Sequence, residues 1–225
     1  MRAQHLKIPP ARTGHRLRIQ PLGDTALLAE LGTRLDTALN TRAIALAAAL
    51  KKRRDVRQAV AGYASVTVHF DPDLATHDSL AAAIKRLAAK HPPMAEPGRL
   101  HRIPVTYDGP DIEAVSTRLG LSPEKIVELH TRPIYRAFLV GFVPGWAYLG
   151  PLAEELALPR RDAPRTQVPA GSVAIANRQT GIYPLPTPGG WHLIGRTKVK
   201  LFLPDSDPPC LFRAGDRIKF FSSQG

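Results

Sequence analysis

The chain has 225 residues, of which 44% are hydrophobic and 22% are charged, a balance typical of a globular protein rather than a disordered one. Its longest apolar run, residues 43–50, is far shorter than the roughly 20 residues of a membrane span, and its single cysteine, Cys210, cannot form an internal disulfide. We therefore expect a cytoplasmic protein with room for one large core or two small ones.

The formal net charge of +12 leaves two interpretations open. It fits a nucleic-acid binder, or an arginine-rich surface that attracts an acidic partner. Two short predicted helices around Gly120 have the spacing of a helix-turn-helix, but the second carries Glu124 and Glu128, which would face phosphates. We favour a structural role for these helices, with neither nucleic acid nor a membrane as a partner.

The first 97 residues predict a small α+β domain that begins with a flexible tail over residues 1–15. Strands are expected near residues 16–20, 25–31, 56–61 and 65–70. Asp36 can cap one helix, and Asp78 or Ser79 can cap another, each followed by apolar residues on one face. This order predicts a ferredoxin-like sandwich, with helices on one face of an antiparallel sheet.

A proline-rich stretch at residues 91–98 predicts a linker, so a second domain is expected over residues 98–225. Its first elements are a strand at 101–107 and helices near 112–119 and 123–130. From Arg136 onward, Gly and Pro interrupt short apolar runs: AFLVGF, GSVAIA, WHLIG, VKLFLP and DRIKFF. That pattern is typical of a closed or nearly closed β-barrel.

Residues 138–197 are unusually dense in Gly, Pro and aromatic residues. Glycine permits positive φ and proline restricts φ, so their alternation predicts a rigid, shaped backbone. A rigid frame with a few polar groups is what a small-molecule site or a tight protein interface requires. The candidate side chains in this stretch are Tyr148, Arg161, Arg165, Ser172, Gln179, Thr180, Tyr183, Trp191 and Arg196.

Each candidate also has a structural interpretation. The arginines could bind a carboxylate or phosphate through their forked donors, or lie in solvated turns. Gln179, Thr180 and Tyr183 could orient a substrate amide, or they could form hydrogen bonds to buried backbone at the rim of the barrel. Trp191 could line a pocket or pack in the core. Ser172 has no neighbouring base, which favours a turn residue over a nucleophile. The sequence contains no phosphate-binding glycine motif and no paired metal-ligand spacing, so we expect no metal site.

The same stretch resembles the allophanate hydrolase subunit 1 family. The resemblance is carried by GFVPGWAYLG, by PRRDAPRTQVPAGSVAIANRQTGIYPLPTPGGWHLIGRT and by the upstream IPVTYDGPDI and VELHT. GDTALLAEL and GYASVTVHFDP match the amino-terminal pattern of the family more loosely. The chain departs from the usual pattern at Trp146 and at residues 176–178.

The resemblance implies an α+β amino-terminal domain followed by a cyclophilin-like β-barrel. In the 5-oxoprolinase branch it implies ATP-dependent opening of 5-oxo-L-proline to L-glutamate, by a B subunit working together with two further subunits, named C and A. Mg-ATP would then bind in the partner or at a shared interface, and this chain alone would be inactive. Two other branches imply a Kip-type histidine-kinase inhibitor or a carboxyltransferase subunit of urea metabolism.

A lactam is resonance-stabilised, so opening its ring requires activation of the amide and hydrogen-bond donors for the anionic oxygens. This chemistry predicts a role for several of the candidate residues. We expect Arg165 or Arg196 to bind the substrate carboxylate or a phosphate, and Gln179 and Tyr183 to bind the lactam amide. His130 is the acid–base candidate. The wider substrate- and phosphate-binding set is Tyr148, Arg161, Ser172, Thr180, Gly189, Gly190, Trp191 and Arg196, in which the two glycines allow close backbone approach.

Overall fold

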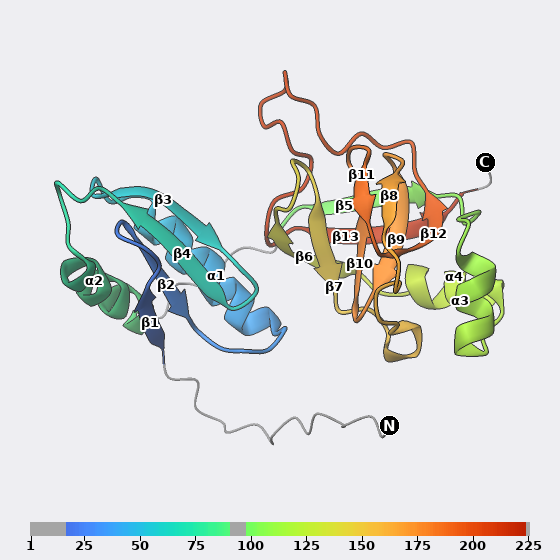
Figure 1. Cartoon of the computed structure of the whole chain (residues 1–225), viewed down its shortest axis with the longest axis horizontal. Coiled ribbons are helices and arrows are strands. Elements are labelled where there is room, and N and C mark those ends of the chain that lie inside the picture. Colours follow the sequence, from blue (N-terminus) through green and yellow to red (C-terminus); the bar gives the residue numbers. More distant parts are fainter. Residues whose placement is uncertain (1–16, 91–97, 224–225) are drawn as a thin grey trace.

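The computed structural model describes residues 17–90 and 98–223, which form two lobes (Figure 1). We call residues 17–90 the N-terminal lobe and residues 98–223 the barrel lobe. The predicted tail and most of the predicted linker lie outside the described residues, so the division of the chain at residue 97 remains a prediction. Among the described residues, every helix is too short or too polar to cross a bilayer.

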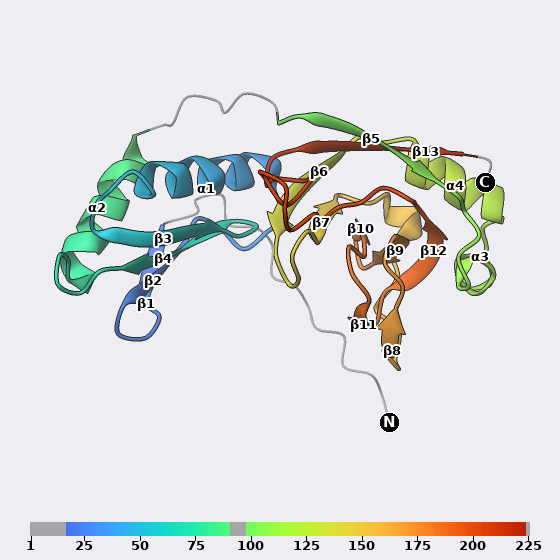
Figure 2. The same cartoon turned by 90° about the horizontal axis from the view of Figure 1, so that it is seen from above.

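The N-terminal lobe is an antiparallel sheet with two helices packed against it. Its strands have the order β1-β2-β4-β3, and Figure 2 shows α1 along one face of the sheet. This confirms the ferredoxin-like layering, but the edge strand β1 precedes β2 as a hairpin instead of following α2. The elements are β1 (Arg18–Pro21), β2 (Ala26–Glu30), α1 (Thr37–Leu50), β3 (Val56–Ala61), β4 (Ser65–Phe70) and α2 (His77–Ala89).

The helix caps show where local reasoning succeeded and where it failed. Asp36 caps α1 as predicted, and its carboxylate accepts the Leu39 N–H at 2.9 Å. The prediction of Asp78 or Ser79 as the cap of α2 was wrong. Thr76 is the cap, because its extended backbone lets its hydroxyl accept the Ser79 N–H while the Ser79 hydroxyl accepts the Thr76 N–H.

The barrel lobe is a seven-stranded sheet in the order β12-β9-β10-β7-β6-β13-β5, and its only parallel pair in the described residues is β13 with β5. The two edges meet where Thr106 and Arg196 exchange backbone hydrogen bonds of 2.9 and 2.8 Å, which nearly closes the barrel. The strands are β5 (Leu100–Val105), β6 (Tyr135–Val140), β7 (Ala147–Gly150), β9 (Ser172–Ala176), β10 (Gln179–Ile182), β12 (His192–Arg196) and β13 (Arg217–Ser222).

Further elements cover the ends of the barrel. The helices α3 (Ile112–Leu119) and α4 (Pro123–Thr131) pack on it, and β8 (Arg165–Val168) pairs with β11 (Thr187–Gly189) as a separate ribbon. The apolar run at residues 199–204 does not form a strand. That stretch makes a single bridge, Phe202 to Cys210, because the loop between them contains three prolines that cannot donate to a ladder.

One buried amide joins the two lobes. The Nδ2 of Asn40 on α1 donates to the Phe138 carbonyl of the barrel lobe at 2.9 Å and lies 3.1 Å from the carbonyls of Gly62 and Tyr63 in its own lobe. Its Oδ1 accepts from Arg136 Nε at 2.9 Å. Asn40 is fully buried, so the docked lobes satisfy an amide that would otherwise be costly to bury.

Closure of the barrel depends on a glycine beside the closing bridge. A Cβ on Gly195 would lie 2.6 Å from the Thr106 oxygen and 2.9 Å from Val105 Cγ1. We expect Gly195→Ala to lower the free energy of unfolding by about 1–3 kcal/mol, because the two edges would be forced apart. Urea unfolding measures the loss.

Gly141→Ala is the matched control, since a Cβ there meets no atom within 4 Å and the backbone needs no positive φ. Its stability should stay within about 0.5 kcal/mol of the parent. Equal stability of the two variants would contradict the close approach of the barrel edges.

Candidate functional site

Aromatic residues and glycines enclose a hollow of about 120 Å³ at one end of the barrel, which we call the aromatic pocket. Five residues predicted from the sequence meet in it: Tyr148, Tyr183, Gly189, Gly190 and Trp191. The structure adds four that the candidate set lacked, namely Phe142, Trp146, Arg160 and Pro188. This volume is of the size of a small metabolite and is far too small for a nucleotide.

Trp146 is the centre of this pocket. Its ring lies 4.7 Å from Tyr183, 5.1 Å from Trp191 and 5.6 Å from Tyr148, each measured between centroids in an edge-on arrangement. Such edge-to-face contacts are favourable between aromatic rings. The indole N–H of Trp146 is buried and finds no acceptor among the described residues.

Two glycines make room for these rings. A Cβ on Gly181 would lie 2.8 Å from the Trp146 ring, and a Cβ on Gly189 would collide with the Tyr183 hydroxyl. Burial raises the pKa of Tyr183 by more than the Trp191 backbone hydrogen bond and the nearby arginine charges lower it. The phenol therefore stays neutral and can donate a hydrogen bond at neutral pH.

A buried carboxylate holds two arginines behind the pocket. Asp111 is 3% exposed, and its Oδ1 accepts from Arg161 Nη1 at 3.0 Å and from Arg165 Nη2 at 2.7 Å. Its Oδ2 accepts the Leu193 N–H at 2.7 Å. Burial opposes ionisation of Asp111, but the Arg165 and Leu193 hydrogen bonds and both arginine charges outweigh it and hold its pKa below the usual range.

This cluster keeps an excess of positive charge next to the aromatic pocket. One carboxylate compensates two guanidinium groups, and Arg160 adds a third on the pocket wall. Arg161 Nε and Arg165 Nη1 are buried without an acceptor in the described part of the chain. The backbone N–H of Arg161 also donates to the Gly190 carbonyl at 2.8 Å, which ties the arginines to the pocket glycines. The arrangement is suited to a small anion.

Asp111 itself was missed from the sequence. It directly precedes α3, so an acidic residue there resembles an ordinary helix cap. In the structure it makes no side-chain cap bond and instead reaches across to β12 and the two arginines. Arg161 and Arg165 lie close together in the sequence, and they would require a negative counter-charge if they were buried. That requirement is the signal that could have pointed to Asp111.

His130 and Thr180 lie in the barrel core, away from the pocket. Both are fully buried, and His130 packs 4.6 Å from the ring of Phe220. The Tyr107 hydroxyl lies 2.7 Å from Nδ1, and Nε2 lies 2.8 Å from the Thr180 hydroxyl, which itself donates to the Ala174 carbonyl at 3.0 Å. We assign the proton to Nε2, since the Thr180 proton is already used. In this geometry the network stabilises the barrel core, and it does not support an acid–base role for His130.

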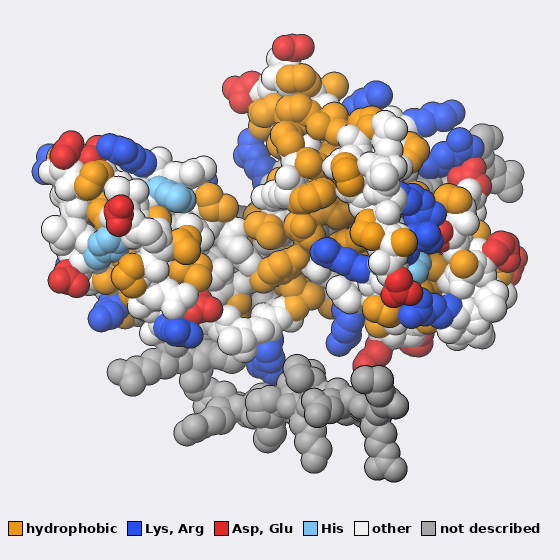
Figure 3. All heavy atoms as spheres, viewed as in Figure 1, with side chains coloured by type: hydrophobic (Ala, Val, Ile, Leu, Met, Phe, Trp, Pro, Cys, Tyr) orange, Lys and Arg blue, Asp and Glu red, His pale blue; other side chains and the backbone are white. Residues whose placement is uncertain are grey.

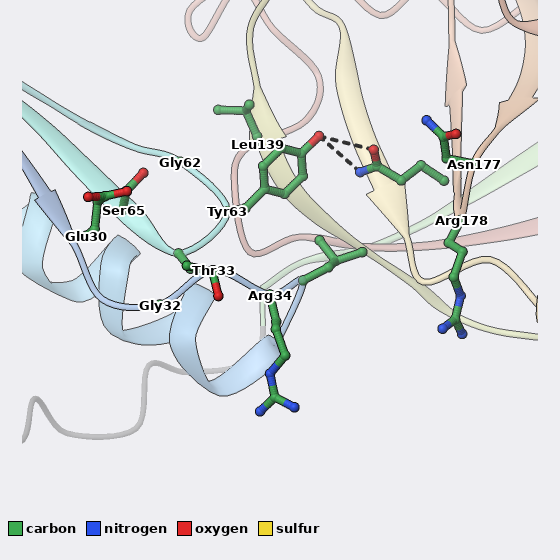
Figure 4. Close-up of a pocket in the computed structure, with 13 residues that line it drawn as sticks. Glu30, Gly32, Thr33, Arg34, Gly62, Tyr63, Ser65, Leu139, Asn177 and Arg178 are labelled. Atoms are coloured by element: carbon green, nitrogen blue, oxygen red, sulfur yellow. Dashed lines mark hydrogen bonds between the residues drawn. The ribbon is translucent and has the colours of Figure 1, made fainter. Parts of the chain in front are cut away.

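The remaining candidates also lie outside the aromatic pocket. The Arg196 side chain is 72% exposed and pairs with Asp108 at 2.6 Å. Ser172 is buried in β9, where its carbonyl accepts the Tyr183 N–H at 2.9 Å. Gln179 faces a second cavity, in which its Nε2 donates to the Tyr63 hydroxyl at 3.0 Å (Figure 4). The expectation that these three groups share one ligand with Tyr183 is therefore unsupported by their positions.

Burial of His130 predicts a pH dependence of stability. Desolvation lowers its pKa from 6.5 to about 3, so the unfolded chain binds a proton below pH 6.5 that the folded chain excludes. Stability should fall as the pH falls through this window. His130→Phe should be less stable at neutral pH, because Tyr107 and Thr180 lose their partner, but it should lose less further stability on acidification.

Urea unfolding of both proteins between about pH 6.5 and about pH 4.5 tests this. If parent and variant lose stability in parallel, another group is responsible for the effect.

The chain matches a family model described as "Carboxyltransferase domain, subdomain C and D" over residues 17–212. It is 43% identical over 212 residues to the 5-oxoprolinase B subunit of Escherichia coli O157:H7, covering 91% of this chain and 95% of that protein. It is 37% identical over 221 residues to the 5-oxoprolinase B subunit of Bacillus subtilis (strain 168), covering 91% and 92%.

Solved structures share the fold. The crystal structure of TTHA0988 superposes with a TM-score of 0.81 at 39% identity, covering 89% of this chain and 40% of that one. The chain thus spans less than half of that longer protein. Kluyveromyces lactis urea carboxylase has a TM-score of 0.71 at 15% identity over 97% of this chain and 23% of that one, which shows a common fold alone.

Proposed function

The chain belongs to the carboxyltransferase domain family, subdomains C and D, and we propose that it acts as the B subunit of an ATP-dependent 5-oxoprolinase in the cytoplasm. The observation that carries this proposal is its 37–43% identity, over 91% of its length, to proteins from three bacteria that are named as the B subunit of 5-oxoprolinase. The family match over residues 17–212 spans the aromatic pocket and the arginines behind it.

The aromatic pocket suits the lactam 5-oxo-L-proline. Its small volume and ring walls favour a flat five-membered ring, while Arg160 and the pair held by Asp111 attract the carboxylate. The neutral Tyr183 hydroxyl is a donor for the lactam oxygen. Donors aimed at that oxygen stabilise the negative charge that develops when the amide bond is opened.

A nucleoside triphosphate does not fit this pocket, whose volume is about 120 Å³. The sequence also lacks the glycine-rich loop that cradles phosphates. We therefore place ATP in the partner protein or at a shared interface, where its hydrolysis drives ring opening. The contribution of this chain is to bind the lactam, orient it and exclude water.

Reconstitution tests the assignment. The chain should co-purify with a homologue of the C subunit, and 5-oxo-L-proline should be converted to L-glutamate only when the A subunit is added together with ATP. The isolated chain should show no 5-oxoproline-dependent ADP release, because its site is incomplete. Robust release by the isolated chain would contradict a composite site.

The family description favours a carboxyltransferase subunit as the second candidate. Dependence on a biotinylated carrier, with no turnover of 5-oxo-L-proline, would establish it. Inhibition of a histidine kinase without turnover would favour the Kip-type branch instead.

Variants of the arginines test the pocket within the reconstituted enzyme. Arg160→Ala should raise the KM for 5-oxo-L-proline roughly tenfold, since one charge-assisted contact is lost. Arg165→Ala should lower activity further. Asp111 keeps Arg161 as a partner in this variant, so a folded protein is expected, and thermal unfolding checks this.

Arg196→Ala is the matched control, because that side chain is exposed and paired with Asp108 outside the pocket. It should retain near-parental activity. Full turnover by both the Arg160 and Arg165 variants, or a large loss in the Arg196 variant, would refute this placement of the substrate.

A further inference from the structure

A second and larger cavity lies between the two lobes, and its volume is about 620 Å³. We call it the interlobe cleft (Figure 4). Its walls come from the β2–α1 loop and the β3–β4 hairpin of the N-terminal lobe, and from β6 and the β9–β10 turn of the barrel lobe. Its size is in the range of small-molecule sites. The proposed reaction makes no use of it.

One end of the cleft is acidic. Glu30 on β2 lies opposite Ser65 on β4 in the sheet, and both line the cleft (Figure 4). The Oε2 of Glu30 is buried and accepts no hydrogen bond from the described residues. Arg18 Nη1 forms a long ion pair with this oxygen at 3.8 Å, and the Arg18 side chain is 72% exposed. An ion pair this long and exposed compensates the carboxylate weakly, so the negative charge of Glu30 can still attract a cationic group to this end of the cleft.

Two arginines supply the opposite charge. Arg34 comes from the β2–α1 loop and Arg178 from the β9–β10 turn, and Figure 4 shows both side chains extending to the same side of the cleft. Both are exposed, and neither forms an ion pair within residues 17–90 and 98–223. Two unpaired guanidinium groups on facing elements are suited to a carboxylate.

The centre of the cleft is apolar with one fixed polar pair. Leu35 and Leu139 line it from opposite lobes. The Tyr63 hydroxyl donates to Gln179 Oε1 at 3.3 Å and accepts from its Nε2 at 3.0 Å. Burial is the main cause that raises the Tyr63 pKa to about 12, so this hydroxyl is neutral at physiological pH. The pair spans the two lobes across the cleft.

We propose that the interlobe cleft binds a small zwitterion, an amino acid or a short peptide. Its ammonium group would bind at Glu30 and its carboxylate at Arg34 and Arg178. The aromatic pocket differs, because arginine is the only charged residue among those that line it. The two cavities therefore select different charges: the pocket takes an anion such as a lactam acid, and the cleft takes a molecule that also has a free ammonium group. This inference is independent of the proposed activity.

Calorimetry on the full chain tests it, with L-glutamate and L-alanyl-L-glutamate as probes. At least one probe should bind saturably at one site per chain, with a dissociation constant of about 1 mM or tighter. N-acetyl-L-glutamate lacks the ammonium group and should bind roughly tenfold more weakly than L-glutamate. Glu30→Gln should remove this preference, because the amide no longer discriminates a cation.

The double variant Arg34→Ala/Arg178→Ala should weaken both probes at least roughly tenfold. Both side chains are exposed, so the variant should fold. Arg196→Ala is the matched control, because that exposed arginine lines neither cavity, and it should bind as the parent does. Three results would overturn the proposal. The first is that neither probe binds saturably, and the second is that the Glu30 variant keeps the preference for an ammonium group. The third is that binding is lost in the Arg160→Ala variant of the aromatic pocket and retained in the double variant.

Discussion

The aromatic pocket depends on the buried carboxylate of Asp111. Its two oxygens hold Arg161, Arg165 and the backbone N–H of Leu193, while its own N–H donates to the Leu193 carbonyl at 3.0 Å. The start of α3 is thereby fastened to β12, to the first residue of β8 and to the segment before β8. Without this charge, two partly buried guanidinium groups would be left unpaired, which costs several kcal/mol in proteins where it has been measured. The residual positive charge is then available for an anion.

The N-terminal lobe is joined to the barrel lobe by polar contacts and by edge-on contacts between aromatic rings. Asn40 bonds to both lobes, and the Tyr63 ring lies 5.9 Å from Tyr148, whose own ring lies 6.0 Å from Trp191. The interlobe cleft and the aromatic pocket therefore share a wall of aromatic side chains. A change in the angle between the lobes would move Tyr63 and hence one side of the pocket. On the face of the molecule shown in Figure 3, basic side chains are spread over both lobes among acidic ones.

Local signals predicted most of the elements, because caps, apolar periodicity and glycine or proline restrictions act over a few residues. Asp36 as a cap and the two antiparallel strands around residue 63 were predicted correctly. The cap of α2 was missed because Thr76, Asp78 and Ser79 are all capping residue types, and the backbone conformation at Thr76 decides among them. The apolar run at residues 199–204 resembles the runs that became strands, but it makes a single bridge because prolines interrupt the segment that faces it.

The sequence by itself predicted the fold class, an α+β sheet lobe followed by a nearly closed barrel, and it identified residue types that line the aromatic pocket. Only the tertiary structure decided which of them share a cavity. Gln179 and Thr180 are neighbours on β10, yet one faces the interlobe cleft and the other faces His130 in the core. Successive side chains of a strand point to opposite sides, so their surroundings depend on barrel register and lobe docking. Those are set by contacts between residues far apart in the chain, such as Asp111 with Arg165 and Asn40 with Phe138.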